Sequence, residues 1–272
     1  MATVLLRGLG PTRRGYVPRG PVPPSPDSIE DLLEWGAGQR LASLRIEPDA
    51  PPELATDLDR IGLRPAAPTQ PTRTEIVALR SETELLGSFQ KKTRYSIRRS
   101  EPLEVEEGLD ADALARQTAA TASRKDIALP DAAYYRLLLE KLAWSRTYVA
   151  KFQGEVVAAN LVARFDGRAY YLYAGWGRKH PELMPAYAAI WGAMRAAARN
   201  ACTDFDLWGV PPEVDRDHPW HSIWVFKRGF GGRSVGYCGA WEVVYGPVGH
   251  AVSRFAEGVR LGIRRTRRLR AH

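Results

Sequence analysis

The sequence predicts a mixed α/β fold of two unequal parts, and three observations support this prediction. The chain has 272 residues, which suits two domains, and 44% of them are hydrophobic, enough to bury a substantial core. Segments in which apolar and polar residues alternate, as in strands, are interspersed with segments that have apolar residues at helical spacing, such as residues 185–199. Twelve of the twenty prolines lie before residue 75, whereas seven of the eight tryptophans lie after residue 143.

The first part reads strand, strand, helix, strand, helix, strand. A helix over 26–39 begins at a cap formed by Ser25 or Asp27, and a helix over 53–61 ends at Gly62. The strands are expected at 3–7, 15–22, 42–47 and 74–80.

One long helix is then expected from Ser81 to Arg99. It starts with the cap sequence Ser-Glu-Thr-Glu at 81–84. Lysine and arginine residues crowd its C-terminal end, where cations suit the helix dipole.

The second part has the element order β-αα-βββ-α-β-α-ββ. Its strands are expected at 103–107, 147–152, 155–165, 169–174, 204–208, 233–238 and 241–246. Its helices are expected at 110–123, 131–143, 185–199 and 219–229. The first part repeats this order from the third strand onward, so the chain reads as one partial and one complete copy of the same module.

These patterns predict a partial first domain with its linking helix at 1–99, a complete domain at 100–246 and a basic amphipathic helix at 247–272. The apolar stripe of that last helix consists of Val252, Phe255, Val259 and Ile263. Residues 251–272 hold seven arginines and one glutamate, so the helix carries most of the positive charge.

The formal net charge of +8 favours an anionic partner, such as nucleic acid, a phosphorylated ligand or an anionic membrane surface. Cys202 and Cys238 are too few for a disulfide framework or a four-cysteine zinc site, which favours a reducing cytoplasm. The N-terminal residues lack the apolar run of a signal peptide. The sequence has no stretch of about 18 uninterrupted apolar residues, and it therefore predicts no membrane span.

Five residue strings carry a resemblance to a known family. The longest and most specific is DLWGVPPEVDRDHPWHSIWVFKRGFGG at 206–232. The shorter ones are YVPRGPV at 16–22, SLRIEP at 43–48, KKTRYSIRRSE at 91–101 and YYLYAGW at 170–176. In this order, and with an element order like that of the GNAT acyltransferases, the chain resembles the Fem family of tRNA-dependent aminoacyltransferases from about residue 15 to 246.

The resemblance implies a tandem GNAT-like fold and an aminoacyltransferase of peptidoglycan biosynthesis, which forms cell-wall cross-bridges and so affects cell shape. The donor would be an aminoacyl-tRNA, and the acceptor would be lipid II or a UDP-linked muropeptide. No cofactor and no metal are implied, because the donor ester is already activated. Family members carry more chain before the YVPRGP-like string, so we expect the first domain to lack its N-terminal half.

The resemblance also implies catalytic residues. Lys227 matches the lysine of the family's FK-x-x-FG string and would stabilise an oxyanion or bind the phosphates at the acceptor end of the tRNA. Phe226 beside it would stack on the terminal adenosine. Glu47 matches an acidic residue after a first-domain strand and would accept or orient a proton of the amine. The competing structural readings are an exposed lysine on a helix and a turn carboxylate before Pro48.

Further residues are expected to bind the acceptor. Thr121 and Arg124 match a Thr/Arg pair that contacts a diphosphate, and an arginine fork suits phosphate well. Tyr173 lies nearest the end of a central strand, where the sheet would open around the substrate. An ordinary surface arginine and a core tyrosine are the alternative readings.

Cations at the C-terminal end of the long helix are candidates for binding tRNA, namely Lys91, Lys92, Arg94 and Arg98. The tail at 264–270 would contact tRNA or the anionic inner leaflet of the membrane. For both, a merely solvated charged surface is the simplest reading. His218 and His221, with Asp215 and Asp217 nearby, have a spacing that allows a metal, but the string fits the family's non-metal motif.

Two other functions remain open at this point. The first is a GNAT enzyme that uses acyl-CoA, although the loops at 174–185 and 18–28 lack the glycine-rich pyrophosphate pattern, and their prolines remove donor amides. The second is a catalytically inactive relative that binds tRNA or a membrane. The expectation is a monomeric cytoplasmic enzyme that docks peripherally on the inner face of the plasma membrane.

Overall fold

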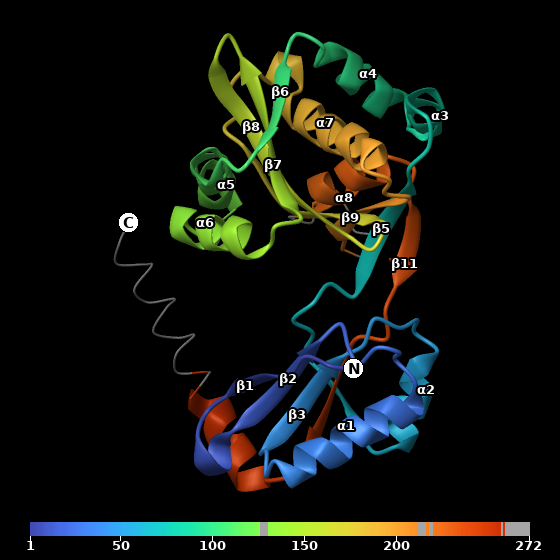
Figure 1. Cartoon of the computed structure of the whole chain (residues 1–272), viewed down its shortest axis with the longest axis vertical. Coiled ribbons are helices and arrows are strands. Elements are labelled where there is room, and N and C mark those ends of the chain that lie inside the picture. Colours follow the sequence, from blue (N-terminus) through green and yellow to red (C-terminus); the bar gives the residue numbers. More distant parts are fainter. Residues whose placement is uncertain (126–129, 212–215, 218–219, 257, 259–272) are drawn as a thin grey trace. The chain divides into compact units, whose positions relative to one another are not determined.

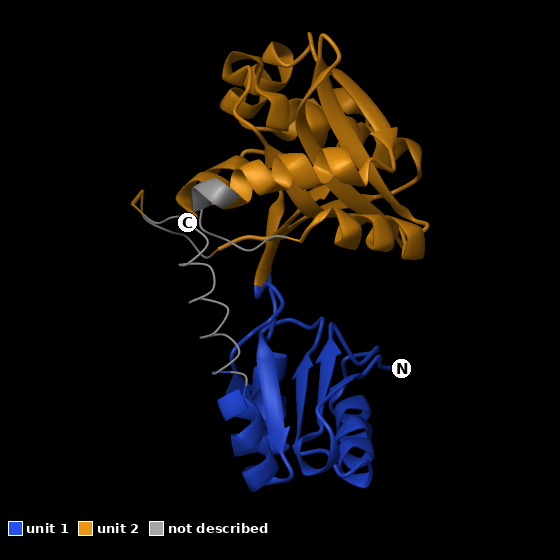
Figure 2. Cartoon of the chain, turned by 90° about the vertical axis from the view of Figure 1, so that its left-hand side faces the viewer, with its two compact units in different colours: residues 1–72, 236–272 blue, residues 73–235 orange. Residues whose placement is uncertain are grey.

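The computed structural model describes residues 1–125, 130–211, 216–217, 220–256 and 258, and the side chains of 123–125 are not described. The chain forms two compact units, each with its own sheet (Figure 2). Unit 1 comprises Met1–Thr72 and Gly236–His272, and unit 2 comprises Arg73–Val235. The fold is mixed α/β, as predicted.

Unit 1 contains a five-stranded sheet in the order β1-β2-β3-β12-β4. Its strands are β1 Leu5–Arg7, β2 Arg14–Pro18, β3 Ser43–Glu47, β4 Arg64–Ala66 and β12 Ala240–Val244. The pair β2–β3 is parallel, whereas β12 runs antiparallel to both of its neighbours. Its helices include α1 Pro26–Gly38, α2 Leu54–Arg60 and a C-terminal helix over residues 247–256, with a 3-10 turn, η1, at Gly10–Thr12.

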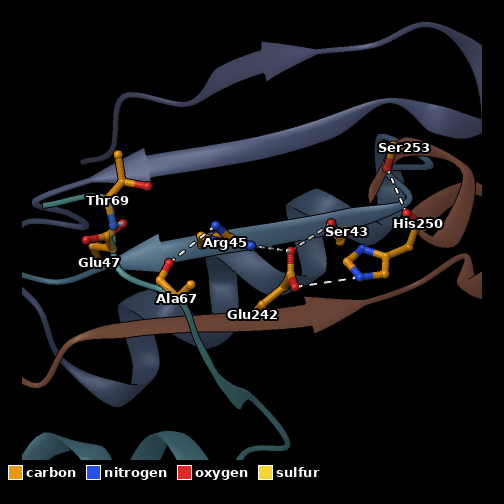
Figure 3. Close-up of polar contacts among 8 residues, drawn as sticks. All are labelled: Ser43, Arg45, Glu47, Ala67, Thr69, Glu242, His250 and Ser253. Carbon is orange, nitrogen blue, oxygen red and sulfur yellow. Dashed lines mark hydrogen bonds and ion pairs between the residues drawn. The ribbon is translucent and has the colours of Figure 1, made fainter. Parts of the chain in front are cut away.

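The core of unit 1 lies on one face of this sheet. Val17, Leu44 and Trp241 pack there with Ile29 and Leu32 of α1. Side chains alternate along strands, so the residues between them point to the opposite face. That opposite face carries polar side chains, namely Arg14, Tyr16, Ser43, Arg45 and Glu242, and Figure 3 shows several of them.

Unit 2 contains a seven-stranded sheet in the order β11-β5-β10-β9-β8-β7-β6. Its strands are β5 Arg73–Ala78, β6 Glu104–Gly108, β7 Ser145–Phe152, β8 Glu155–Phe165, β9 Arg168–Trp176, β10 Asp204–Gly209 and β11 Arg233–Gly236. Its helices are α3 Glu82–Ser88, α4 Lys91–Arg99, α5 Ala111–Lys125, α6 Ala132–Lys141, α7 Pro185–Arg199 and α8 His221–Arg228. A 3-10 turn, η2, covers Pro181–Leu183.

Helices cover both faces of the unit 2 sheet (Figure 1). One core joins α5 and α6 to the sheet through Leu114, Tyr135 and Leu161. The other joins α7 to the opposite face, where Trp191 and Met194 pack with residues of α3 and α4. From β6 to β11, unit 2 follows the element order that the sequence predicts for the complete module, but the last predicted strand of that module belongs to unit 1.

The two sheets exchange strands that sequence order alone does not predict. β5 follows the elements of unit 1 along the chain but pairs with β10 in the sheet of unit 2. β12 follows unit 2 but pairs with β3 and β4 in the sheet of unit 1. Each sheet is therefore completed by a strand from a distant part of the sequence.

The predicted long helix over 81–99 is wrong, because the structure has two helices, α3 and α4. Phe89 and Gln90 adopt extended backbone between them, with ψ values of 152° and 150°. The Phe89 ring is buried, with edge contacts to Trp191 at 5.8 Å and Phe230 at 5.2 Å. Burial of this ring directs the chain into the core and ends α3.

The C-terminal helix is helical over residues 247–256, within the predicted range 247–272, whose later part lies outside the described residues. β4 was not predicted, because a three-residue strand with a proline carries no alternation signal. Among the described residues, no helix is long and apolar enough to cross a membrane.

Candidate active site

Two parallel strands of unit 2 separate at their carboxyl ends. β9 and β10 pair from Arg168–Asp204 to Tyr170–Asp206. Beyond that point β10 continues with β5 alone, through an irregular register between Asp206 and Gly209. Ligands of open α/β sheets bind where neighbouring strands diverge at their carboxyl ends. The divergence of β9 and β10 is therefore the candidate active site.

A buried carboxylate shapes this end of β10. Asp206 is 1% exposed and accepts a 2.7 Å hydrogen bond from the backbone N–H of Trp208. The hydroxyl of Thr74 on β5 contacts the same carboxylate and lies 3.0 Å from the Trp208 carbonyl oxygen. Trp208 adopts a left-handed backbone with φ of 59°. Asp206 and Thr74 thus stabilise the bend that turns β10 away from β9.

Lys227 reaches the same place from α8. Its side chain is buried, and its Nζ donates a 2.8 Å hydrogen bond to the carbonyl oxygen of Gly209. Burial lowers the pKa of Lys227 to about 8, although the nearby Asp206 carboxylate acts in the opposite direction. A buried ammonium at the separated ends of two strands is a preorganised positive charge, suited to an anionic atom.

Phe226, which precedes Lys227, lies in an aromatic cluster. Its ring is partly buried, with edge contacts to Tyr187 at 5.0 Å and to Phe230 at 5.3 Å. Stacking of Phe226 on a nucleobase therefore stays a prediction.

Tyr173, on β9, contacts two tyrosines of α6. Its hydroxyl is 3.1 Å from that of Tyr134, and its ring makes an edge contact with Tyr135 at 5.1 Å. Burial, with the neighbouring tyrosines, raises the pKa of Tyr173 well above its ordinary value. The phenol is therefore neutral at physiological pH, and it is suited to hydrogen bonding.

Thr121 is fixed at the C-terminal part of α5. Its hydroxyl donates to the Gln117 carbonyl at 3.3 Å and accepts a 3.2 Å hydrogen bond from the backbone N–H of Trp176. The hydroxyl thus joins α5 to the end of β9. The backbone of Arg124 lies in the same helix, whereas its side chain is outside the described part of the chain.

Glu47 lies in unit 1, at the end of β3. It is 3% exposed, and its two oxygens accept hydrogen bonds from the backbone N–H groups of Thr69 at 2.8 Å and Gln70 at 2.7 Å. The carboxylate therefore holds the chain after β4. Its predicted role toward the amine remains a prediction, and it belongs to a different unit from Lys227.

The predicted tRNA-binding cations lie on α4. Lys91, Lys92 and Arg98 are exposed, and Arg94 bends back to donate to the Phe89 carbonyl. The second predicted contact, the tail at 264–270, lies outside the described residues, as do Asp215 and His218 of the imagined metal motif. Within the described residues, no group of three or more His, Cys, Asp and Glu side chains is arranged to hold a metal.

Two residues of the site were not predicted from the sequence. Asp206 opens the long 206–232 string but was not singled out, and Thr74 lies far away in sequence. Their contact depends on the pairing of β5 with β10. An aspartate two residues before a tryptophan–glycine pair is a weak local signal for such a bend.

Comparison with known proteins finds a family model that matches part of the chain. Residues 140–258 match the model of the FemAB family, and this segment contains both Asp206 and Lys227. The predicted resemblance to the Fem family is thereby confirmed for this segment. No curated protein sequence matches the chain.

Solved structures confirm the GNAT-like fold class. The structure titled FemX is 16% identical, with a TM-score of 0.79 over 90% of this chain and 84% of that one. The C-terminal domain of a putative lysylphosphatidylglycerol synthetase from Agrobacterium fabrum is 15% identical, with a TM-score of 0.58 over 95% and 85%. A tandem GNAT protein of clavulanic acid biosynthesis is 14% identical, with a TM-score of 0.51 over 90% and 79%.

Proposed function

We propose that this protein transfers an amino acid from an aminoacyl-tRNA to the stem peptide of a peptidoglycan precursor. The match to the FemAB family and the fold shared with FemX support a peptidoglycan cross-bridge aminoacyltransferase or a related acyltransferase. The observation that carries the finer proposal is the buried ammonium of Lys227 at the divergence of β9 and β10.

The proposed reaction is an aminolysis. The uncharged amine of the acceptor attacks the ester carbonyl carbon, a C–N bond forms, and the ester C–O bond breaks. The ribose hydroxyl of the tRNA leaves and takes the proton that the amine loses. Negative charge develops on the carbonyl oxygen in the tetrahedral intermediate, and a fixed positive charge lowers the energy of that state.

Lys227 has the properties that this step needs. An ammonium has three N–H donors, of which the hydrogen bond to Gly209 uses one. Gly209 also fixes the direction of the side chain, so that little reorganisation accompanies the reaction. With a pKa of about 8, Lys227 is mostly protonated at pH 7.

The other predicted residues would bind substrates. Thr121 and Tyr173 present hydroxyls near the end of β9, where they would contact the acceptor together with Arg124. The exposed cations of α4 would contact tRNA phosphates, and Glu47 would orient or deprotonate the amine. In this proposal the protein acts in the cytoplasm as a monomer and contacts the inner membrane only peripherally.

The loop before α7 argues against an acyl-CoA donor. A pyrophosphate cradle needs backbone N–H groups that point outward. Here Leu183 and Met184 donate their amides to carbonyls of the loop itself, those of His180 and Pro181. Pro181 and Pro185 contribute no donor.

A transfer assay tests the proposal. Purified protein is mixed with radiolabelled aminoacyl-tRNAs and either lipid-linked or nucleotide-linked muropeptide, and the labelled acceptor is identified by mass. Label in the muropeptide that is lost after ribonuclease treatment of the donor would support the proposal. A parallel reaction contains radiolabelled acyl-CoA in place of the aminoacyl-tRNAs. Label transferred only in that reaction, or tRNA binding without transfer, would overturn the proposal in favour of one of the two alternative functions.

A further inference from the structure

A pocket of about 390 Å³ lies within unit 2, between the helices α3, α4 and α7 and the start of β6. Figure 1 shows these three helices on the same side of the sheet, away from α5 and α6. Small-molecule sites in proteins commonly measure about 300–1,000 Å³. The pocket is therefore large enough for a small ligand, and its described walls all belong to unit 2.

Half of the described lining of this pocket is apolar. The apolar residues are Leu86, Ile97, Leu103, Val105, Ala188 and Trp191. The ring of Trp191 also makes an edge contact with Phe89 in the core at 5.8 Å, so the core of unit 2 holds this wall in place. Because apolar area that leaves water stabilises a complex, the pocket favours a ligand with an apolar body.

Arginine side chains form most of the charged part of the lining. Arg94, Arg98 and Arg195 contribute three guanidinium groups, and Glu82 and Glu101 contribute two carboxylates. No other charged residue is among the described residues that line the pocket. A ligand with a single negative charge would therefore balance the charges of this lining.

Two of these arginines retain donors for a ligand. The side chain of Arg98 is exposed, and within the described part of the chain it has no hydrogen bond or ion pair. One Nη of Arg195 lies 4.0 Å from a Glu82 oxygen, and its Nε is buried with no hydrogen-bond partner in the described chain. Hydrogen bonds from N–H to oxygen usually measure about 2.7–3.2 Å, so Glu82 leaves the donors of Arg195 largely unused.

We propose that this pocket binds a small monocarboxylate with an apolar body. The carboxylate would pair with Arg195 of α7 and Arg98 of α4, because a guanidinium and a carboxylate match in geometry. The guanidinium of Arg195 lies 5.8 Å from the centroid of the Trp191 ring, so one ligand can contact both the charge and the apolar wall. This inference does not depend on the proposed transfer reaction, and no described lining residue belongs to β9 or β10.

Isothermal titration of the full chain with 3-phenylpropionate, in the absence of tRNA, tests the proposal. We expect saturable 1:1 binding that Arg195→Gln weakens by about tenfold or more, the usual effect of losing a hydrogen bond to a charged group. The control Arg199→Gln changes an exposed arginine of α7 outside the described lining and should leave the affinity unchanged. Arg98→Gln should also weaken binding, whereas Arg99→Gln, its exposed neighbour on α4, should not.

Three further probes keep the phenyl group and change the charge. Phenethylamine is a cation and should not bind, and phenylalanine adds an ammonium group and should bind more weakly than 3-phenylpropionate. Phenyl phosphate carries more than one negative charge at neutral pH and should bind no more tightly. Tighter binding of any of the three would overturn the choice of a monocarboxylate.

The site itself is tested by the variants. Absence of saturable binding of 3-phenylpropionate would overturn the proposal. Equal affinities of Arg195→Gln and Arg199→Gln, together with equal affinities of Arg98→Gln and Arg99→Gln, would place the ligand elsewhere and overturn it too. Arg98 is exposed on α4, so its variant keeps the test decisive even if Arg195→Gln does not fold.

Discussion

Nζ of Lys227 lies 2.8 Å from the carbonyl oxygen of Gly209, so that an ammonium from α8 ends where β10 parts from β9. The lysine side chain is buried, and the carboxylate of Asp206 is the negative charge that acts on it. Burying a charge is costly unless partners compensate it. The retention of this ammonium in unit 2 is the central structural reason for assigning it a chemical role.

Replacement of Lys227 by methionine keeps the apolar stem and removes the charge. We expect transfer to fall by about 100-fold or more, the usual effect of losing a preorganised oxyanion partner. The fold should persist, as measured by circular dichroism, because the buried Asp206 carboxylate keeps its hydrogen bonds from Trp208 and Thr74. The control Arg228→Gln changes the neighbouring exposed cation, which lies over Trp224 at 5.0 Å, and should retain activity. Near-normal transfer by Lys227→Met would remove Lys227 from the mechanism.

The pH dependence of transfer should follow the protonation of Lys227. Its pKa of about 8 means that the cation is lost as pH rises through that value, so kcat/KM should fall above about pH 8. Arginine stays charged, so an active Lys227→Arg variant should lack this alkaline decline. A wild-type profile that keeps rising to pH 10 would contradict the prediction.

The same shift has a consequence for stability, with a defined sign. The folded-state pKa of Lys227 lies below the ordinary value of 10.5, so the unfolded chain binds this proton more tightly. Its contribution to the free energy of unfolding therefore rises between about pH 8 and pH 10.5. Denaturant titrations across this pH range give the free energy of unfolding at each pH. This free energy should rise more steeply with pH for wild type than for Lys227→Met, and equal slopes against pH would refute the burial argument.

Asp206→Asn should lower the pKa of Lys227 further, because the carboxylate favours the charged lysine. The asparagine side chain has nearly the same shape and can still accept from Trp208. The alkaline decline of transfer should move to lower pH. Asp204→Asn, on the same strand, is the control and should leave the profile in place. An unchanged profile for Asp206→Asn would show that the two groups do not interact.

The cations of α4 should contribute to tRNA binding through phosphates. A triple variant with glutamine at Lys91, Lys92 and Arg98 should weaken tRNA binding. The slope of log affinity against log salt concentration should also fall by about one unit for each cation–phosphate pair that the variant removes. Lys141→Gln on α6 also removes an exposed cation of unit 2 and serves as the control. Equal affinities and slopes for both variants would make α4 a merely solvated surface.

Gly231 should resist substitution for a structural reason. It has φ of +64°, and an added Cβ would lie 2.4 Å from the carbonyl oxygen of Ser88. Gly231→Ala should therefore cost about 1–3 kcal/mol or more of unfolding free energy, from backbone strain and the clash. Gly62→Ala is the control, since Gly62 also has positive φ but its Cβ would meet open space. Equal losses in urea unfolding would contradict the role of the clash.

Local patterns predicted most of the elements, because each helix and strand is set largely by periodicity and caps. The helix α1 is capped by Ser25, whose hydroxyl accepts from the N–H of Ser28, and α3 is capped by Ser81, which forms a capping box with Glu84. The break at Phe89 was missed, since it depends on tertiary burial of that ring. The exchange of β5 and β12 was missed for the same reason, since strand pairing between distant segments has no local signal.

The candidate site was predicted only in part. Lys227 was identified through the string that contains it, but its burial and its partner Gly209 were not foreseen. Asp206 and Thr74 meet only after β5 joins the sheet of unit 2. The predicted exposed-lysine alternative does not hold, because the side chain is buried. Sequence strings thus indicated which residue matters, whereas the long-range strand pairing determines its environment.

The most direct test of the central claim is transfer of label from aminoacyl-tRNA to a muropeptide by wild type and Lys227→Met, measured by mass spectrometry at about pH 7. The account predicts labelled muropeptide with the wild-type protein, loss of the product when the donor is treated with ribonuclease, and about 100-fold less product with the variant. Absence of product with every aminoacyl-tRNA and both acceptor forms, from a folded wild-type protein, would contradict it.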